Sequence, residues 1–356
     1  MVLAERSLIA QIRRLAKTRL AKTRLAKTRL AKTRLAKTRP AKTRLAKTRD
    51  NPAVLAGIGD DCAVLRLARR SGKPIDTLVT TDFSLEGVHF RRDWHSPESV
   101  GHRCLARGLS DIAAMGGEPL AAFLSLALPR GLPQSWVDRF AGSLLTLAEK
   151  YAVTLAGGDT AQSPNGILAD IVVLGTVPKG KALLRSGTRP GDRIYVSGEL
   201  GASAATLRQM QKDPRRKLNP RDYPRHFFPE PRIKLGQVLR EKGLASAMID
   251  TSDGLSTDLS HICEESGVGA ELQAELIPKS RIGRALQEVD LEFALHGGED
   301  YELLFTAPPH KRVPARIGGV PITQIGQITR GRKIFLTNHS GAAHELQPQG
   351  WEHFRK

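Results

Sequence analysis

The order of hydrophobic and polar positions beyond residue 50 predicts strands that alternate with helices. Short β-branched runs indicate strands, and apolar residues spaced three or four positions apart indicate helices. The Ser96-Pro97 step is typical of a helix start, because serine caps the first turn and proline is tolerated there. In this part of the chain we expect a strand at Thr77–Thr81, a helix from Pro97 to about Gly116, a helix from about Gln134 to Lys150 and a strand at Ile167–Val177.

A turn cluster at Thr188–Asp192 marks the start of a second domain to within about ten residues. The segment Lys212–Pro231 is rich in Pro, Arg and Asp, which predicts a surface loop. Either Ser252 or Asp253 is expected to cap a helix that reaches about Ser266. The other predicted elements are strands at Arg193–Ser197, Ala247–Asp250, Tyr301–Thr306 and Ile322–Thr329 and a helix at Arg232–Lys242.

These patterns predict an α+β fold of two α/β domains. We assign residues 1–49 to a first helix and a basic arm, residues 50–180 to the first domain and residues 181–356 to the second. The first boundary follows the end of the repeat arm at Arg49, and the second lies within about ten residues of the turn cluster at Thr188–Asp192.

The net charge of +19 is concentrated in the arm. The pentapeptide Leu-Ala-Lys-Thr-Arg occurs seven times over residues 15–49, with Pro40 in place of one leucine, so that the remaining 321 residues carry only +5. A leucine at every fifth position advances about 140° on a helix and gives no apolar face. The arm could be a tether for nucleic acid or an anionic membrane surface, but it lacks aromatic residues for base stacking. An expanded repeat in a tolerant terminal segment is the interpretation we favour.

The composition of the whole chain, with 40% hydrophobic and 26% charged residues, is ordinary for a globular protein. No apolar run is long enough to span a membrane, and early charges at Glu5 and Arg6 argue against a signal peptide, so a cytoplasmic protein is expected. The cysteines Cys62, Cys104 and Cys263 are far apart, which argues against a disulfide framework or a thiolate zinc site.

Six clusters place carboxylates next to glycines or hydroxyl side chains at the predicted ends of elements. Carboxylates that converge with few basic neighbours would repel one another unless cations lay between them, and Mg²⁺ prefers such oxygen ligands. The clusters therefore predict a metal-assisted phosphoryl-transfer site. They are Gly59-Asp60-Asp61, Thr80-Thr81-Asp82, Ser110-Asp111, Gly157-Gly158-Asp159-Thr160, Asp250-Thr251-Ser252-Asp253-Gly254 and Gly297-Gly298-Glu299-Asp300.

Other phosphate and hydrolase motifs are excluded. The stretch Gly175–Ala182 nearly matches a P-loop, but Ala182 replaces the required hydroxyl residue and Pro178 lies inside the loop. The chain contains neither H-E-x-x-H nor G-x-S-x-G, so zinc-hydrolase and serine-hydrolase chemistry are not expected.

In this order, the acidic clusters resemble those of the thiamine-monophosphate kinase family, within the aminoimidazole ribonucleotide synthetase-like superfamily. The resemblance spans about residues 7–354 and includes Glu86-Gly87-Val88-His89-Phe90, Leu184-Arg185-Ser186-Gly187 and Gly298-Glu299-Asp300-Tyr301-Glu302-Leu303. It implies an α+β fold whose N-terminal mixed sheet dimerises and whose C-terminal α/β domain completes the active site. It also implies direct in-line phosphorylation of thiamine monophosphate by ATP to give thiamine diphosphate, with several Mg²⁺ ions and a homodimer.

The resemblance also assigns residues. The implied metal ligands are Asp61, Thr80, Thr81, Asp82, Asp111, Asp159, Asp250 and Asp253. The implied ATP contacts are Gly158, Asp159, Arg185 and Ser252, and the implied catalytic residues are Asp111, Asp159 and Arg185. The implied thiamine-phosphate contacts are His89, Glu299 and Trp351, although Trp351 could instead be a partly buried surface anchor.

Two other functions remain open at this stage. Another ATP-using enzyme of the superfamily, such as aminoimidazole ribonucleotide synthetase, would share part of the metal and ATP clusters. A non-catalytic basic interaction protein would explain the arm, but it would not explain the retention of every acidic position. The repeat itself departs from the family pattern and resembles an insertion between the first helix and the Gly57 loop.

Overall fold

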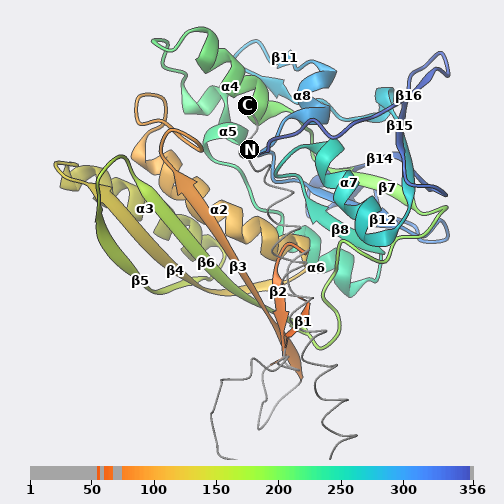
Figure 1. The fold of residues 1–356 in the computed structure, drawn as a ribbon, viewed down its shortest axis with the longest axis horizontal. Helices are drawn as coiled ribbons and strands as arrows, with labels where there is room; N and C mark the ends of the chain where they lie inside the picture. The colour runs from red at the N-terminus through yellow and green to blue at the C-terminus, as the bar shows by residue number, and fades with distance from the viewer. Residues whose placement is uncertain (1–53, 57–59, 67–73, 353–356) are drawn as a thin grey trace, which may run out of the picture.

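The computed structural model describes residues 54–56, 60–66 and 74–352. The repeat arm at 15–49 lies outside these described residues. The described chain forms two sheets with helices packed against them (Figure 1). None of its helices combines the length and the apolar character that crossing a membrane would require.

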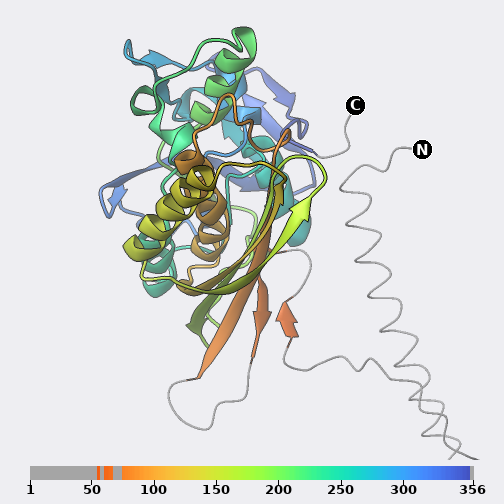
Figure 2. The same ribbon diagram turned by 90° about the vertical axis from the view of Figure 1, so that its left-hand side faces the viewer.

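The first sheet has six strands in the order β1-β2-β3-β6-β4-β5. Helices α2 (Pro97–Ala114) and α3 (Gln134–Lys150) lie on one face, and Figure 2 shows no described element across the other, which we call the open face. Phe83 on the open face is 58% exposed. The strands are β1 (Val54–Ala56), β2 (Ala63–Leu65), β3 (Ile75–Leu85), β4 (Glu118–Pro129), β5 (Thr154–Ser163) and β6 (Leu168–Pro178).

Helix α2 begins and ends as the sequence predicts. The Ser96 hydroxyl accepts a hydrogen bond from the Ser99 backbone amide at 3.3 Å, and Pro97 occupies the first turn. The helix stops before Gly116, whose φ of +66° favours glycine. Because α2 packs against β3, β6, α3, α6 and β8, nearly all of its residues are buried, including Arg103 and Arg107.

Close approach of α2 and α3 depends on Gly101, so we expect Gly101→Ala to destabilise the protein. A Cβ at this position would lie 2.1 Å from the carbonyl oxygen of Phe140 on α3. The helices would have to separate, which should lower the free energy of unfolding by about 1–3 kcal/mol. Gly142→Ala on α3 is the control: its Cβ meets nothing within 4 Å. Urea denaturation should show it unchanged or more stable, whereas a wild-type midpoint for Gly101→Ala would contradict the close contact.

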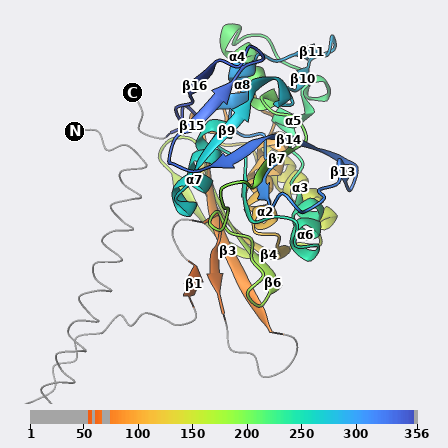
Figure 3. The same cartoon turned by 90° about the vertical axis from the view of Figure 1, so that its right-hand side faces the viewer.

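The second sheet follows the order β16-β15-β9-β14-β7-β12-β8, with β13 paired to β14. Figure 3 shows β7 and β14 side by side at its centre. A separate ribbon joins β10 (Arg281–Ile282) to β11 (Gln287–Glu288). The strands of the second sheet are β7 (Arg193–Ser197), β8 (Ala247–Asp250), β9 (Gly269–Gln273), β12 (Leu303–Ala307), β13 (Arg316–Ile317), β14 (Val320–Thr329), β15 (Ile334–Thr337) and β16 (Ala343–Glu345).

The second half of the described chain contains five further α-helices. They are α4 (Ala202–Lys212), α5 (Pro224–Phe227), α6 (Ile233–Glu241), α7 (Leu255–Ser266) and α8 (Leu291–His296), with 3-10 turns at Pro220–Asp222 and Ala274–Leu276. One hydrophobic core contains residues of α2 and the first sheet together with Met248 and Phe305 of the second. Because α2 contacts both β3 and β8, it links the first sheet to the second.

Most sequence predictions for individual elements are confirmed, and two are wrong. The segment 212–231 is not simply a surface loop, because Tyr223, His226 and Phe227 are buried in and around α5. Neither Ser252 nor Asp253 caps α7 with its side chain. Instead, the Asp258 carboxylate accepts the Gly254 amide at 2.9 Å, which satisfies the helix start from inside the first turn.

Candidate active site

Three acidic side chains from separate parts of the chain meet where the two sheets adjoin. Asp61 precedes β2, Asp111 lies near the end of α2, and Asp250 ends β8. One carboxylate oxygen from each lies within 4.8 Å of the others. Asp61 and Asp250 are buried, with 8% and 1% exposure. The sequence therefore correctly groups these three acids, and residues of both sheets are needed to form the cluster.

Burial and neighbouring negative charges raise the pKa of two acids of this cluster, Asp250 and Asp111. Burial and then the charge of Asp61 raise the pKa of Asp250 to about 8. Burial and the charges of Asp82 and Asp250 raise the pKa of Asp111 well above its usual range. Burial also raises the pKa of Asp82. Full ionisation of the cluster at neutral pH therefore requires a compensating positive charge.

The donor set fits Mg²⁺. Among the described residues, buried carboxylate oxygens of Asp61, Asp82 and Asp250 accept no hydrogen bond from the protein. The other oxygens of two of these acids are held: the Ser110 hydroxyl donates to Asp250 at 2.5 Å, and the Arg185 guanidinium donates to Asp61 at 2.7 Å. The neighbouring Asp111 accepts a hydrogen bond from the Thr80 hydroxyl. Oriented carboxylates with free lone pairs are the ligands that a hard divalent cation takes.

The Arg185 side chain reaches the cluster. The Arg185 guanidinium bonds Asp61 at 2.7 Å, and the Arg185 backbone amide donates to Asp60 at 2.8 Å. Although burial opposes it, the charge of Asp61 raises the pKa of Arg185 above its usual range. Arg185 is thus a positive charge beside the acids, and its Nε atom has no hydrogen-bond partner within the part of the chain that the structure describes. A guanidinium in that position can bind phosphate oxygens.

Thr81 and Asp159 lie on the open face of the first sheet and do not join the three-acid cluster. In the strand register Phe83, Asp170, Ser125 and Asp159 stand opposite one another across β3, β6, β4 and β5. Opposed residues share a face, and so does Thr81, two positions from Phe83. Thr80 and Asp82 therefore point to the helical face, while Thr81 donates a hydrogen bond to Asp170 at 2.7 Å. The sequence analysis did not select Asp170.

Gly158 has a packing reason to be glycine. Its φ is +154°, and a Cβ would lie 1.8 Å from the carbonyl oxygen of Leu124 on β4. No other residue could keep β5 in this register, which places Asp159 on the open face. Its predicted phosphate contact is not tested by this geometry and stays a prediction.

The loop 251–254 gathers the segments that carry the predicted substrate residues. The backbone carbonyl of Ser252 accepts the Glu299 amide at 2.8 Å, and that of Asp253 accepts the Trp351 amide at 3.0 Å. Trp351 is 53% exposed, so about half of this side chain faces solvent beside this loop. Glu299 and Trp351, far apart in sequence, thus lie against the same turn after β8.

Two buried arginines hold Glu299. Arg103 and Arg107, one turn apart on α2, each donate to a different oxygen of the Glu299 carboxylate at 2.5 Å. Although burial opposes it, the charges of these arginines hold the pKa of Glu299 well below its usual range. Arg103 also donates to the carbonyl oxygen of His89 at 3.4 Å. Both arginines were missed by the sequence analysis, and Arg103 connects the predicted substrate residues Glu299 and His89.

Two further missed residues, His95 and His226, lie behind Arg103. Their Nε2 atoms are 3.0 Å apart, and the nearer Arg103 nitrogen lies 3.2 Å from His95. Burial, followed by the charge of Arg103, lowers the pKa of His95 to about 3 and that of His226 well below its usual range. Both rings are therefore neutral at physiological pH, and the positive charge of Arg103 is paired with Glu299.

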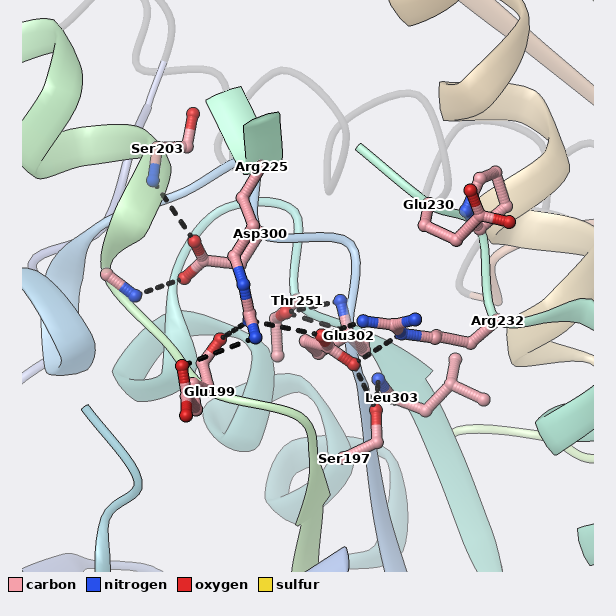
Figure 4. Close-up of polar contacts among 12 residues, drawn as sticks. Ser197, Glu199, Ser203, Arg225, Glu230, Arg232, Thr251, Asp300, Glu302 and Leu303 are labelled. Carbon is pink, nitrogen blue, oxygen red and sulfur yellow. Dashed lines mark hydrogen bonds and ion pairs between the residues drawn. The ribbon is translucent and has the colours of Figure 1, made fainter. Parts of the chain in front are cut away.

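The residues that follow Glu299 anchor this segment (Figure 4). Asp300 accepts the backbone amides of Gly201 at 2.6 Å and Ser203 at 3.3 Å, at the start of α4. Glu302 accepts bonds from Arg232 and, at 2.5 Å, from the Ser197 hydroxyl. These acids have structural partners, in contrast to the free oxygens of the three-acid cluster.

The chain matches two family models. Residues 59–177 match the AIR synthase related protein, N-terminal domain, and residues 189–338 match its C-terminal domain. Thiamine-monophosphate kinase of Escherichia coli strain K12 is 40% identical over 307 residues, which cover 84% of this chain and 91% of the relative.

Solved structures of the same kind of enzyme are similar to this fold. A ThiL structure complexed with AMPPCP and TMP has a TM-score of 0.71 and 33% identity, and the match covers 83% of this chain and 91% of that one. The thiamine-monophosphate kinase of Stenotrophomonas maltophilia K279a has a TM-score of 0.68 and 35% identity over 83% of this chain and 93% of its own. With an acidic cluster formed by both sheets and these relatives along most of its length, the chain belongs to the thiamine-monophosphate kinase family.

Proposed function

We propose that the protein transfers the γ-phosphoryl group of ATP to thiamine monophosphate and so forms thiamine diphosphate and ADP. The observation that carries this proposal is the three-acid cluster. In a chain of this family, its carboxylate oxygens without hydrogen-bond donors among the described residues can bind a metal ion. An oxygen of the substrate's phosphate attacks the γ-phosphorus in line, and the bond to the ADP oxygen breaks. The reaction needs no covalent intermediate on the protein.

Asp61, Asp82, Asp111 and Asp250 would hold Mg²⁺ at the helical face, with Asp253 nearby in the loop after β8. Bound Mg²⁺ would neutralise the charge on the transferring phosphoryl group. Arg185 would leave Asp61 to bind phosphate oxygens of ATP, together with Gly158 and Ser252. Glu299, fixed by its two arginines, would orient the thiamine moiety with His89 and Trp351.

Turnover with ATP, Mg²⁺ and thiamine monophosphate tests this function, with thiamine diphosphate separated by chromatography. We expect product only when all three are present. EDTA should abolish the reaction because phosphates cannot approach the acids without a cation, and added Mg²⁺ should restore it. Product formation that continues in EDTA would contradict the metal role. A folded protein that binds ATP but forms no product would favour another substrate of the superfamily.

We also propose that the first domain, divided from the second near residue 180, pairs with a second copy through its sheet, and that the enzyme acts in the cytoplasm. The open face offers Phe83, at 58% exposure, and Leu85, at 37%, with no described element over them. Exposed apolar surface of this kind favours association. Pairing there would place Thr81 and Asp159 beside the interface, where they could add metal and phosphate contacts.

Light scattering should give twice the chain mass of 38.8 kDa. Phe83→Glu should shift the protein to a monomer, because a charge would be buried in the interface. Leu276→Glu changes an equally apolar, 41% exposed position of the second domain and should leave the dimer intact. A wild-type monomer, or a Phe83→Glu dimer, would contradict pairing through this face.

A further inference from the structure

A cavity lies on the C-terminal domain, outside the candidate active site. It occupies about 520 Å³ between β7, β14 and the loop 308–315 that precedes β13. Figure 3 shows the β13 hairpin projecting from the sheet on the side of α6. None of its ten lining residues belongs to the acidic cluster, to the loop 251–254 or to the Glu299 segment. The volume is within the range of small-ligand pockets.

Apart from Tyr195, the ionisable side chains that line this cavity are all basic. Arg193 comes from β7, and His310, Lys311 and Arg312 come from the loop 308–315. Arg193, Lys311 and Arg312 form no ion pair within the described residues, whereas many surface cations of the chain do. Three cationic side chains thus face one cavity, and no carboxylate of the described residues pairs with them. A bound anion would supply that balance.

The cavity has a firm base and a restrained rim. Tyr195 is 6% exposed, and its ring stacks on Phe305 with centroids 5.3 Å apart. The loop carries prolines at 308, 309 and 314, and the Lys311 amide donates to the carbonyl oxygen of Pro308 at 2.9 Å. Proline fixes φ, so the loop loses little freedom when the cations bind a ligand. Because Tyr195 is nearly covered, recognition falls to the charged rim.

We propose that this basic cavity, lined by Arg193, Lys311 and Arg312, binds a small anion that carries two or more phosphate groups. The planar guanidinium groups suit phosphate oxygens, and three cations match the charge of a di- or triphosphate. A free polyphosphate and the phosphate chain of a nucleotide share this chemistry. The site is distinct from the catalytic one, because it offers no carboxylates for a metal and needs none to hold an anion.

Protection of Lys311 from acetylation tests the proposal at the level of one residue in the full chain. The probes are inorganic triphosphate and ADP, each used in EDTA so that metal-dependent binding at the acidic cluster is suppressed. Mass spectrometry should show Lys311 acetylated at least about fivefold more slowly with one or both probes. Lys212, an exposed residue at the end of α4, should change less than about twofold. Stronger protection by ADP would identify a nucleotide, and stronger protection by triphosphate a free polyphosphate.

Arg312→Glu and Arg316→Glu form a matched pair of variants. Both replace an exposed arginine by glutamate, but Arg312 lines the cavity and Arg316 does not. Arg312→Glu should raise the probe concentration needed to protect Lys311 at least about tenfold, and Arg316→Glu should raise it less than about threefold. Thiamine-monophosphate phosphorylation should be unchanged in both. Equal weakening by the two variants, equal protection of Lys212 and Lys311, or protection by a single-stranded RNA and by neither small probe would overturn the proposal.

Discussion

Asp111→Asn is expected to reduce turnover at least about a thousandfold while the protein stays folded. The substitution keeps the side-chain volume but removes a negative charge from the centre of the three-acid cluster. The Thr80 hydroxyl could still donate to the asparagine oxygen, so the local hydrogen bond is retained. Since Asp82, Asp250 and Asp61 all repel the Asp111 charge, the variant should be at least as stable as the wild type without metal.

Turnover with ATP, Mg²⁺ and thiamine monophosphate, measured beside thermal unfolding, separates lost chemistry from lost structure. Asp138→Asn on α3 is the matched control, because its carboxylate accepts only a local bond from Gln134 on the surface. It should keep wild-type activity. If Asp111→Asn turned over at the wild-type rate, Asp111 would not be a metal ligand, and the cluster would need another explanation.

The sequence predicts the acidic cluster well because its information is local. Asp61, Asp111 and Asp250 each stand near one end of a predicted element, and these ends meet where the sheets adjoin. Helix α2 is equally accessible to sequence analysis, since Ser96, Pro97 and Gly116 mark its ends. Cap residues and hydrophobic spacing depend only on the nearest few residues, and that local information is enough to predict the ends of α2 and the positions of the acids.

The arginines of α2 show what local patterns omit. Arg103 and Arg107 would be expected at a solvated face of an amphipathic helix. In the structure, α2 is covered by strands on one side and by α3, α6 and β8 on others, so this polar stripe is buried and bonds Glu299. Two arginines one turn apart within a mainly apolar helix were the available signal. Their partner, almost 200 residues away, could not be identified from them.

The position of Asp159 depends on register, which is also a long-range property. Sequence neighbours suggest that Asp159 converges with the other acids, but its side-chain direction follows from how β5 pairs with β4. A shift of one residue would turn it to the helical face. Gly158 contributes to this choice through its contact with Leu124, and that contact cannot be seen in the pattern of either strand alone.

Arg232→Met is expected to cause the largest loss of stability among the ion pairs of the described structure. Arg232 lies before α6 and donates two hydrogen bonds to Glu302, one of them at 2.7 Å, while the Glu302 side chain is only 1% exposed. The remaining cation, Arg225, is 3.5 Å from the same carboxylate and cannot replace the bidentate contact. Leaving a buried carboxylate without its main partner should lower the free energy of unfolding by about 3 kcal/mol.

Arg232→Met should also disturb the active site, because Glu302 lies three residues after Glu299 and its backbone forms hydrogen bonds with Thr251 of the loop 251–254. Urea denaturation followed by fluorescence and by circular dichroism measures the stability, and the KM for thiamine monophosphate measures the effect on the site. Arg139→Met breaks a pair with Glu98 on the surface, where water and salt replace the partner, and should change neither quantity appreciably. Equal denaturation midpoints for the two variants would show that Glu302 does not depend on Arg232 and that the Glu299 segment is anchored by Asp300 and Ser197 instead.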